Sequence, residues 1–522
     1  MASVLSERTG SLDMSVLEVK TTAGIVRGIP GWNQAIAVFR GIPYAKAPVG
    51  ELRWKAPQPV EPWEGVRETY TFGNICYQER RASEGGDDII GNEFYCLDWP
   101  RDEDCLYLNV WTPIRRKGKL PVCVYLHGGG FAQGYGHLNC YDGEGFAKRG
   151  CVMVSVNHRL GLFGYFAHPE LTAEDAHHTS GNYGVLDIFA ALQWVQENIE
   201  AFGGDPEHVT VFGQSGGGEK VMHCVISPLA KGMIHGAIMQ SSFPINRCGG
   251  DTQTLAESEQ KGVDVLKAMG YSSIDEARAA SQEEIQEKFK HVSDTLGWDP
   301  LMGVGPNIDG YVFPEQMCTI AQRGDYPDLP IMLGCTADEF AMPVPELTDE
   351  RIAADADRIL GEGHREEFRE ALSIDTDPEK AKAMYATGFL MTGAMHAGAK
   401  AWCEASVKNG KKAPYQYYVT VVPPGAAAAQ HSTEHHYVFQ TLTKSSRPYT
   451  GRDYDLSNAL AAYWANFVKT GDPNGEGLPV WEPYTAKKPE AMMLEYDLHM
   501  APQPLSPVEK LMVKHNLEAM GE

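Results

Sequence analysis

Short apolar runs alternate with longer helical patterns from about residue 105 onward. Runs rich in branched residues at 105–111, 121–126 and 152–156 have the length of buried strands. The segment 183–199 instead repeats its apolar residues at helical spacing. Further strands are predicted at 208–212, 233–239, 330–333 and 415–422, with Asp205-Pro206 marking a break before the first of them. This alternation predicts an α/β fold, with a mostly parallel central sheet and helices on both faces.

Two charged stretches, 251–290 and 348–409, are rich in Ala and Glu. They are predicted to be helical excursions above the sheet and over the active site. The chain contains no internal repeat or low-complexity linker, so residues 1–522 are predicted to form a single large domain.

Composition narrows the class of protein. Of the 522 residues, 43% are hydrophobic and 22% are charged, which excludes wholesale disorder. The chain has 45 basic against 69 acidic residues, a net charge of −24, which argues against nucleic acid and anionic membrane surfaces as partners. No apolar run approaches the roughly 18 residues needed to span a bilayer, and no signal peptide is visible. Eleven Cys without a Cys-x-x-Cys pair, and no Asn-x-Ser/Thr sequon, favour a cytoplasmic protein with mostly reduced thiols.

The most informative segment is the Gly-x-Ser-x-Gly motif at 213–217, which places Ser215 between an apolar strand and a helical pattern. A tight strand-to-helix turn strains the nucleophile backbone and exposes its hydroxyl at the carboxyl edge of the sheet. The same serine could merely cap the helix that follows. The strand before the motif and the helix after it favour a catalytic Ser215.

A second glycine-rich segment, His-Gly-Gly-Gly-Phe at 127–131, follows another predicted strand. Acyl transfer develops negative charge on the carbonyl oxygen, and backbone N–H groups without side chains in the way can stabilise it. A phosphate-binding loop would instead end in Gly-Lys-Ser/Thr, which Phe131-Ala132 does not supply. Two such elements, each at the end of a strand, indicate an esterase.

These motifs together resemble the type-B carboxylesterase (cholinesterase-like) family, with the bacterial para-nitrobenzyl-esterase-like branch nearest. The resemblance extends from about residue 20 to about residue 490 and rests also on the segments 39–44, 103–111, 157–160, 180–184, 202–206, 463–467 and 470–473. It implies an α/β-hydrolase fold with the chain order Ser, acid, His. It also implies that Cys76 and Cys105, which secreted members pair, stay apart in a reducing cytoplasm.

The resemblance places the acid in Gly-Cys-Thr-Ala-Asp-Glu-Phe at 334–340, where the family's second carboxylate is Glu339 and Asp338 is the fallback. The family has Gly where this chain has Phe340. The base matches His431, which precedes an aromatic-Val-Phe end at the family's distance. His435 and His436 do not lie at that distance. A solvated His-rich loop, or zinc ligation by His431 and His435, are the alternatives.

On these roles, neutral His431 takes the Ser215 proton during attack on an ester carbonyl, and Glu339 fixes the imidazole tautomer. The N–H groups of Gly129, Gly130 and Gly216 are expected to hold the oxyanion. No metal or organic cofactor is expected, and the partner is a small-molecule ester. Because an unperturbed histidine titrates near pH 6.5, hydrolysis is predicted to fall below about pH 6.

Substrate choice is only partly defined. Phe131, Phe243 and Phe340 are candidates for an acyl pocket, although ordinary core aromatics are an equal alternative. Cholinesterases place an acidic residue before the serine, where this chain has Gln214, so choline esters are not expected. The same site could act on an amide, lactone or thioester. A non-catalytic binding relative would have lost the Ser or the His, and this chain keeps both.

Overall fold

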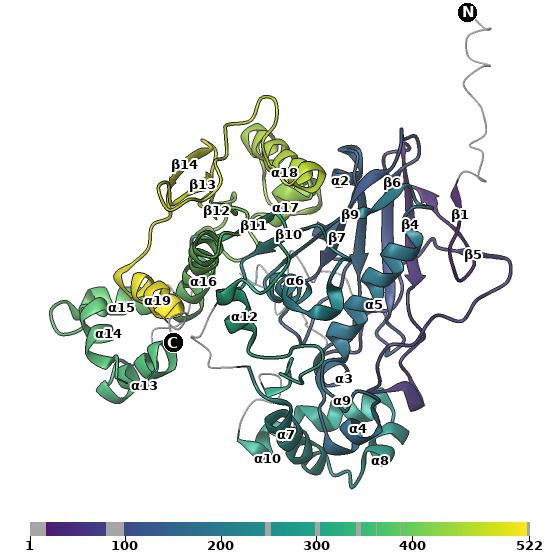
Figure 1. Ribbon diagram of the computed structural model, residues 1–522, viewed down its shortest axis with the longest axis horizontal. Helices are drawn as coiled ribbons and strands as arrows, with labels where there is room; N and C mark the ends of the chain where they lie inside the picture. The colour runs from purple at the N-terminus through teal and green to yellow at the C-terminus, as the bar shows by residue number, and fades with distance from the viewer. Residues whose placement is uncertain are drawn as a thin grey trace, which may run out of the picture.

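The computed structural model describes residues 17–79, 99–245, 252–297, 303–340, 346–361, 363–386 and 388–518. An eleven-stranded sheet with strand order β14-β13-β12-β11-β10-β9-β7-β8-β6-β4-β3 crosses the molecule (Figure 1). In chain order its strands are β3 (Ile29–Pro30), β4 (Ile36–Pro43), β6 (Tyr107–Pro113), β7 (Leu120–Leu126), β8 (Val152–Val156), β9 (Gly204–Gln214), β10 (Gly236–Gln240), β11 (Ile331–Thr336), β12 (Tyr415–Val419), β13 (Glu490–Leu494) and β14 (His499–Pro502). A smaller sheet contains β1 (Glu18–Lys20), β2 (Ile25–Arg27) and β5 (Val66–Glu68).

The centre of the large sheet is parallel and its edges are antiparallel. Every neighbouring pair from β13 to β8 is parallel. At one edge β14 runs antiparallel to β13, and at the other β6, β4 and β3 continue the sheet in antiparallel pairs. The predicted mostly parallel sheet is therefore confirmed. The antiparallel edges were not predicted: β6 matches the strand expected at 105–111, but the sequence does not show its direction, and β3, β4 and β14 were not expected.

Strand boundaries differ from the sequence expectation most clearly in β9. This strand begins at Gly204, so Asp205 and Pro206 lie inside it rather than before it. The pairing of β9 with β7 shifts register between Leu120 and Val122, which face Gly204 and Val209. A bulge of this kind accommodates a proline, which has no N–H to donate to the ladder.

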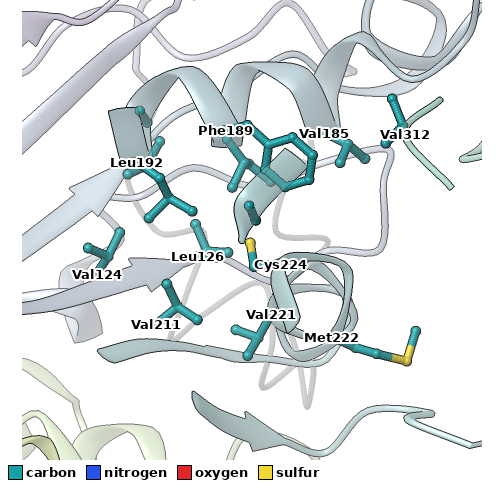
Figure 2. Packing of buried hydrophobic residues seen from close by; sticks show 14 of the residues in the cluster. Val124, Leu126, Val185, Phe189, Leu192, Val211, Val221, Met222, Cys224 and Val312 are labelled. Carbon is teal, nitrogen blue, oxygen red and sulfur yellow. The ribbon is translucent and has the colours of Figure 1, made fainter. Parts of the chain in front are cut away.

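The two faces of the sheet are buried against different helices. On β7, Val124 and Leu126 belong to one buried cluster and Cys123 and Tyr125 to another, as expected when successive side chains point to opposite faces. The first cluster includes residues of α5 (Tyr183–Asn198) and α6 (Gly216–Ile226), and the second includes residues of α18 (Gly451–Thr470). Figure 2 shows Leu126 and Val211 of the sheet beside Val221 of α6. This packing anchors the helix that follows Ser215.

The two charged stretches form helices, as predicted. The first contains α7 (Leu255–Ala268), α8 (Ile274–Ala279) and α9 (Gln282–Lys290), with residue 251 outside the described residues. The second contains α13 (Asp349–Leu360), α14 (Arg365–Leu372), α15 (Pro378–Ala386) and α16 (Phe389–Lys408), beside the C-terminal helix α19 (Pro507–Glu518) (Figure 1). None of the helices in the described ranges has the length and apolar character that crossing a membrane requires. Cys76 and Cys105 are free thiols, and both are buried.

Candidate active site

Ser215 occupies a single-residue turn between β9, which ends at Gln214, and α6, which begins at Gly216. Its backbone has φ 58° and ψ −131°, a strained conformation for a residue other than glycine. A Cβ on Gly217 would lie 2.1 Å from the carbonyl oxygen of Leu126, and one on Gly213 would lie 2.5 Å from the same atom. Both motif glycines are therefore required by the close approach of β7.

The second glycine-rich segment lies against this turn. It follows β7 directly, and its Gly129 and Gly130 have φ of 93° and 63°. A Cβ on Gly216 would lie 2.4 Å from the oxygen and 2.6 Å from the Cα of Gly130. The structure thus brings the backbones of Gly130 and Gly216, two of the three predicted oxyanion donors, into direct contact.

Glu339 lies in the loop after β11 and is buried against His431. The ring Nδ1 of His431 is hydrogen-bonded to Oε2 of Glu339, and the backbone N–H of Thr336 donates to Oε1 at 2.7 Å. Burial alone would raise the pKa of Glu339, but the adjacent imidazole and these hydrogen bonds outweigh it and hold the pKa below its usual value. The carboxylate therefore stays ionised beside the imidazole.

The fallback acid, Asp338, has a different place. Its Oδ2 accepts a hydrogen bond from the backbone N–H of Ala429 at 3.0 Å, two residues before His431. The backbone N–H of His431 in turn donates to the carbonyl of Glu339 at 2.8 Å. Asp338 thus fastens the two loops together, while Glu339 faces the imidazole.

The remaining imidazole nitrogen is hydrogen-bonded to Gln214, a contact that the motif did not predict. Nε2 of Gln214 lies 3.0 Å from Nε2 of His431. Because the Nδ1 hydrogen is directed at Glu339, the ring Nε2 is an acceptor and the Gln214 amide is the donor. Within the described residues, no hydrogen bond joins the Ser215 hydroxyl to His431 in this conformation.

The neighbouring histidines have other partners. Nε2 of His435 lies 3.0 Å from the Tyr125 hydroxyl, and burial lowers the pKa of His435 to about 3. Nδ1 of His436 lies 3.0 Å from Oγ1 of Thr441, and burial lowers its pKa to about 4. Over the part of the chain that the structure describes, no three His, Cys, Asp or Glu side chains are grouped so that they could hold a metal ion.

A cavity of about 660 Å³ opens over these residues. Ser215, His431 and the loop 128–131 line it, and so do the three aromatic residues considered for an acyl pocket, Phe131, Phe243 and Phe340. The Phe340 ring lies 4.3 Å from the imidazole ring, so this departure from the family pattern places an aromatic ring beside His431. The two helical excursions also line the cavity, with Phe289 from α9 and Met395 from α16.

Two further residues near Ser215 were not predicted. Glu219 lines the cavity one turn after Ser215, and burial raises its pKa to about 7. Lys220 is fully buried beneath the glycine-rich loop. The positions of these two residues depend on the helical phase of α6 and on its packing. The motif specifies neither, so it does not predict that these residues lie at the site.

A family model described as the carboxylesterase family matches residues 15–512. The chain belongs to this family. This carboxylesterase-family chain is 31% identical to carboxylesterase 1E of Rattus norvegicus over 515 residues, which cover 92% of the chain and 90% of that protein. It is 32% identical to fumonisin B1 esterase of Sphingopyxis macrogoltabida over 469 residues, which cover 87% and 82% respectively.

Solved structures of esterases have the same fold as this chain. A thermophilic PNB esterase superposes with a TM-score of 0.78 at 28% identity, covering 96% of this chain and 99% of that one. A second PNB esterase structure gives a TM-score of 0.79, also at 28% identity. The predicted family and α/β-hydrolase fold are confirmed, and with them the prediction of a carboxylic ester hydrolase.

Proposed function

We propose that this carboxylesterase hydrolyses small-molecule carboxylic esters with Ser215 as nucleophile, His431 as general base and Glu339 as the carboxylate that orients the imidazole. One observation carries the proposal. Ser215, in its strained turn, and His431, hydrogen-bonded to the buried Glu339, open onto one cavity although they lie far apart in the chain.

The chemistry begins with a change of partner at the imidazole. Nε2 of His431 exchanges the Gln214 amide for the Ser215 hydroxyl and takes its proton as the serine oxygen attacks the ester carbonyl. Before this exchange Gln214 favours the tautomer that the step needs, because its N–H donates to Nε2, the nitrogen that must be unprotonated to accept the serine proton. Glu339 then stabilises the imidazolium without taking the proton itself.

The developing oxyanion is assigned to the N–H groups of Gly129, Gly130 and Gly216. The contact between Gly130 and Gly216 supports this assignment, since it directs both donor segments to one place beside the Ser215 turn. Collapse of the intermediate returns the proton from His431 to the leaving alcohol. His431 then activates water to release the acyl group, so each step uses only this chain's own groups and water.

The cavity wall favours esters with an apolar portion. Phe131, Phe243 and Phe340 stand around the reacting groups, and Met395 adds to the same wall. An apolar acyl chain would bury its surface there, at about 25 cal/mol for each Å² removed from water. We therefore assign these three aromatic residues to the acyl pocket.

The test is a series of nitrophenyl esters of increasing acyl length, measured with the wild type and with Ser215→Ala. Losing the nucleophile of a studied serine hydrolase lowers turnover about 10⁶-fold, and we expect a loss of this order. A Ser215→Ala variant that keeps most of its turnover would refute the assignment. Matched thioester, amide and lactone substrates show whether the ester is the preferred bond.

A further inference from the structure

Lys220 is a fully buried lysine in the helix that carries the nucleophile turn. Its exposed fraction is 0%, and it lies at the fifth position of α6, five residues after Ser215. Its Nζ donates hydrogen bonds to the carbonyl oxygens of His127 at 3.0 Å and Gly130 at 2.9 Å. It also lies 5.4 Å from the centroid of the Phe131 ring. A lysine is rarely buried so completely, so these contacts need an explanation.

The two carbonyls bracket the glycines that carry the proposed oxyanion donors. Five successive carbonyls, from His127 to Phe131, each accept a hydrogen bond, and Lys220 supplies two of the five donors. The others are the ring Nδ1 of His127 to Gly128 at 2.8 Å, the N–H of Gln133 to Gly129 at 3.2 Å and the N–H of Gly161 to Phe131 at 2.7 Å.

Fixing a carbonyl also fixes the N–H of the same peptide unit. In a trans peptide the C=O and the N–H that follows it point in opposite directions and lie in one plane. The His127 carbonyl therefore orients the N–H of Gly128, and the Gly130 carbonyl orients that of Phe131. The peptide units of the Gly129 and Gly130 N–H groups lie between these two fixed planes, so neither unit can rotate freely.

We propose that Lys220 is a positioning residue for the oxyanion hole, which fastens both ends of the loop 128–130 so that the Gly129 and Gly130 N–H groups point at the serine. This inference rests on the proposed function of Ser215. In this proposal the buried Lys220 side chain holds the loop rigid. Oxyanion stabilisation needs this rigidity, because donors fixed in advance cost no reorganisation during the reaction.

The two hydrogen bonds from Lys220 to the His127 and Gly130 carbonyls, called the clamp below, do not depend on the protonation state of the lysine. Burial lowers the pKa of Lys220 to about 7, although the neighbouring Glu219 opposes the shift. A neutral amine still carries two N–H hydrogens and an ammonium carries three, so both forms can donate to the two carbonyls. The property of Lys220 that matters for this role is therefore the length of its side chain and its N–H donors.

The test compares wild type with Lys220→Met, which has a similar length and no donor. Each is measured with a nitrophenyl ester, with an alkyl trifluoromethyl ketone and with the matching alkyl methyl ketone. The trifluoromethyl ketone adds the Ser215 oxygen to its carbonyl carbon, the carbonyl electron pair moves to oxygen, and His431 takes the serine proton. The methyl ketone binds without forming an appreciable amount of this adduct.

We expect Lys220→Met to lower kcat and to weaken the trifluoromethyl ketone by roughly 10- to 100-fold, less than the 10²–10³ of deleting a donor outright. KM and methyl ketone affinity should change little, because the cavity wall is intact. Lys400→Met is the matched control, since Lys400 lies in α16 with its Nζ 4.5 Å from the Tyr484 ring, away from the cavity. It should leave all four quantities unchanged.

The outcomes separate the two proposals. A Lys220→Met chain that folds and binds both ketones as the wild type does would overturn the role of Lys220. Wild-type chain that forms no Ser215 adduct with the trifluoromethyl ketone would instead overturn the proposed function. Should Lys220→Met fail to fold, Lys220→Gln keeps two hydrogens on one nitrogen at shorter reach. For Lys220→Gln, the ratio of trifluoromethyl ketone affinity to methyl ketone affinity should then lie between the ratio for wild type and the ratio for Ser215→Ala. A ratio equal to that of wild type would contradict the clamp.

Discussion

The nucleophile side and the base side of this site are built by different means. Around Ser215, backbone packs directly on backbone, with Gly217 against the Leu126 carbonyl and Gly216 against Gly130. Around His431, side chains hold one another through hydrogen bonds, with Glu339 on one ring nitrogen and Gln214 on the other. The structure around Ser215 should therefore be sensitive to a single added atom. Activity that depends on His431 should be sensitive to a single changed proton or charge.

After loss of the nucleophile itself, the largest effect is expected on the base side, from Glu339→Gln. The amide keeps the shape of the carboxyl group, but it loses the charge that stabilises the imidazolium and can hold the wrong tautomer. The corresponding change in a studied triad lowers kcat about 10⁴-fold, and we expect a similar loss with a nitrophenyl ester.

Asp338→Asn is the control for this variant. Its side chain contacts the Ala429 backbone rather than the imidazole, so its kcat should remain within about tenfold of wild type, the range of one ordinary hydrogen bond. If Asp338→Asn were the more damaging of the two, the assignment of Glu339 as the acid would be wrong.

On the nucleophile side, Gly217→Ala should destabilise the chain without changing any titratable group. The added Cβ would lie 2.1 Å from the Leu126 carbonyl oxygen, a backbone atom that cannot rotate away. Overpacking of this kind costs about 1–3 kcal/mol, which would appear as a lower urea midpoint together with lost activity. Gly451→Ala, at the start of α18 where a Cβ meets nothing within 4 Å, should unfold at the wild-type midpoint or above it. Equal midpoints for the two variants would contradict the steric account.

A smaller effect is expected from pH alone. The base must be unprotonated to take the serine proton, so kcat/KM should fall toward acid pH. The pKa of Glu339 is held below its usual value, so its carboxylate remains ionised over this range, whereas burial raises the pKa of Glu219 in the same cavity to about 7. The measurement is a pH profile between 5 and 8, and a flat profile would argue against a histidine base.

The local parts of this site could be predicted from the sequence. Ser215 lies in a motif whose strand, turn and helix are contiguous, and the loop at 127–131 directly follows its own strand. The short apolar runs of the central strands predicted the parallel core in the same way. Glu339 and His431 came from family resemblance, because nothing in the sequence around either shows that they meet.

The rest depended on contacts between distant residues. Gln214 and His431 are 217 residues apart, and Lys220 reaches carbonyls about 90 residues earlier, so no local pattern signals either contact. The edge strands β4 and β14 are ordered by their neighbours rather than by their own periodicity. The single-domain boundary at 1–522 and the cytoplasmic location stay predictions.

The central claim is that Ser215 alone carries the acyl group. It is tested most directly by treating the wild-type chain with a nitrophenyl dialkyl phosphate and locating the adduct by peptide mass spectrometry. We predict one phosphoryl group per chain, on Ser215, with turnover lost in the same proportion. Stoichiometric labelling of another residue, or full turnover by a chain already modified at Ser215, would contradict the account.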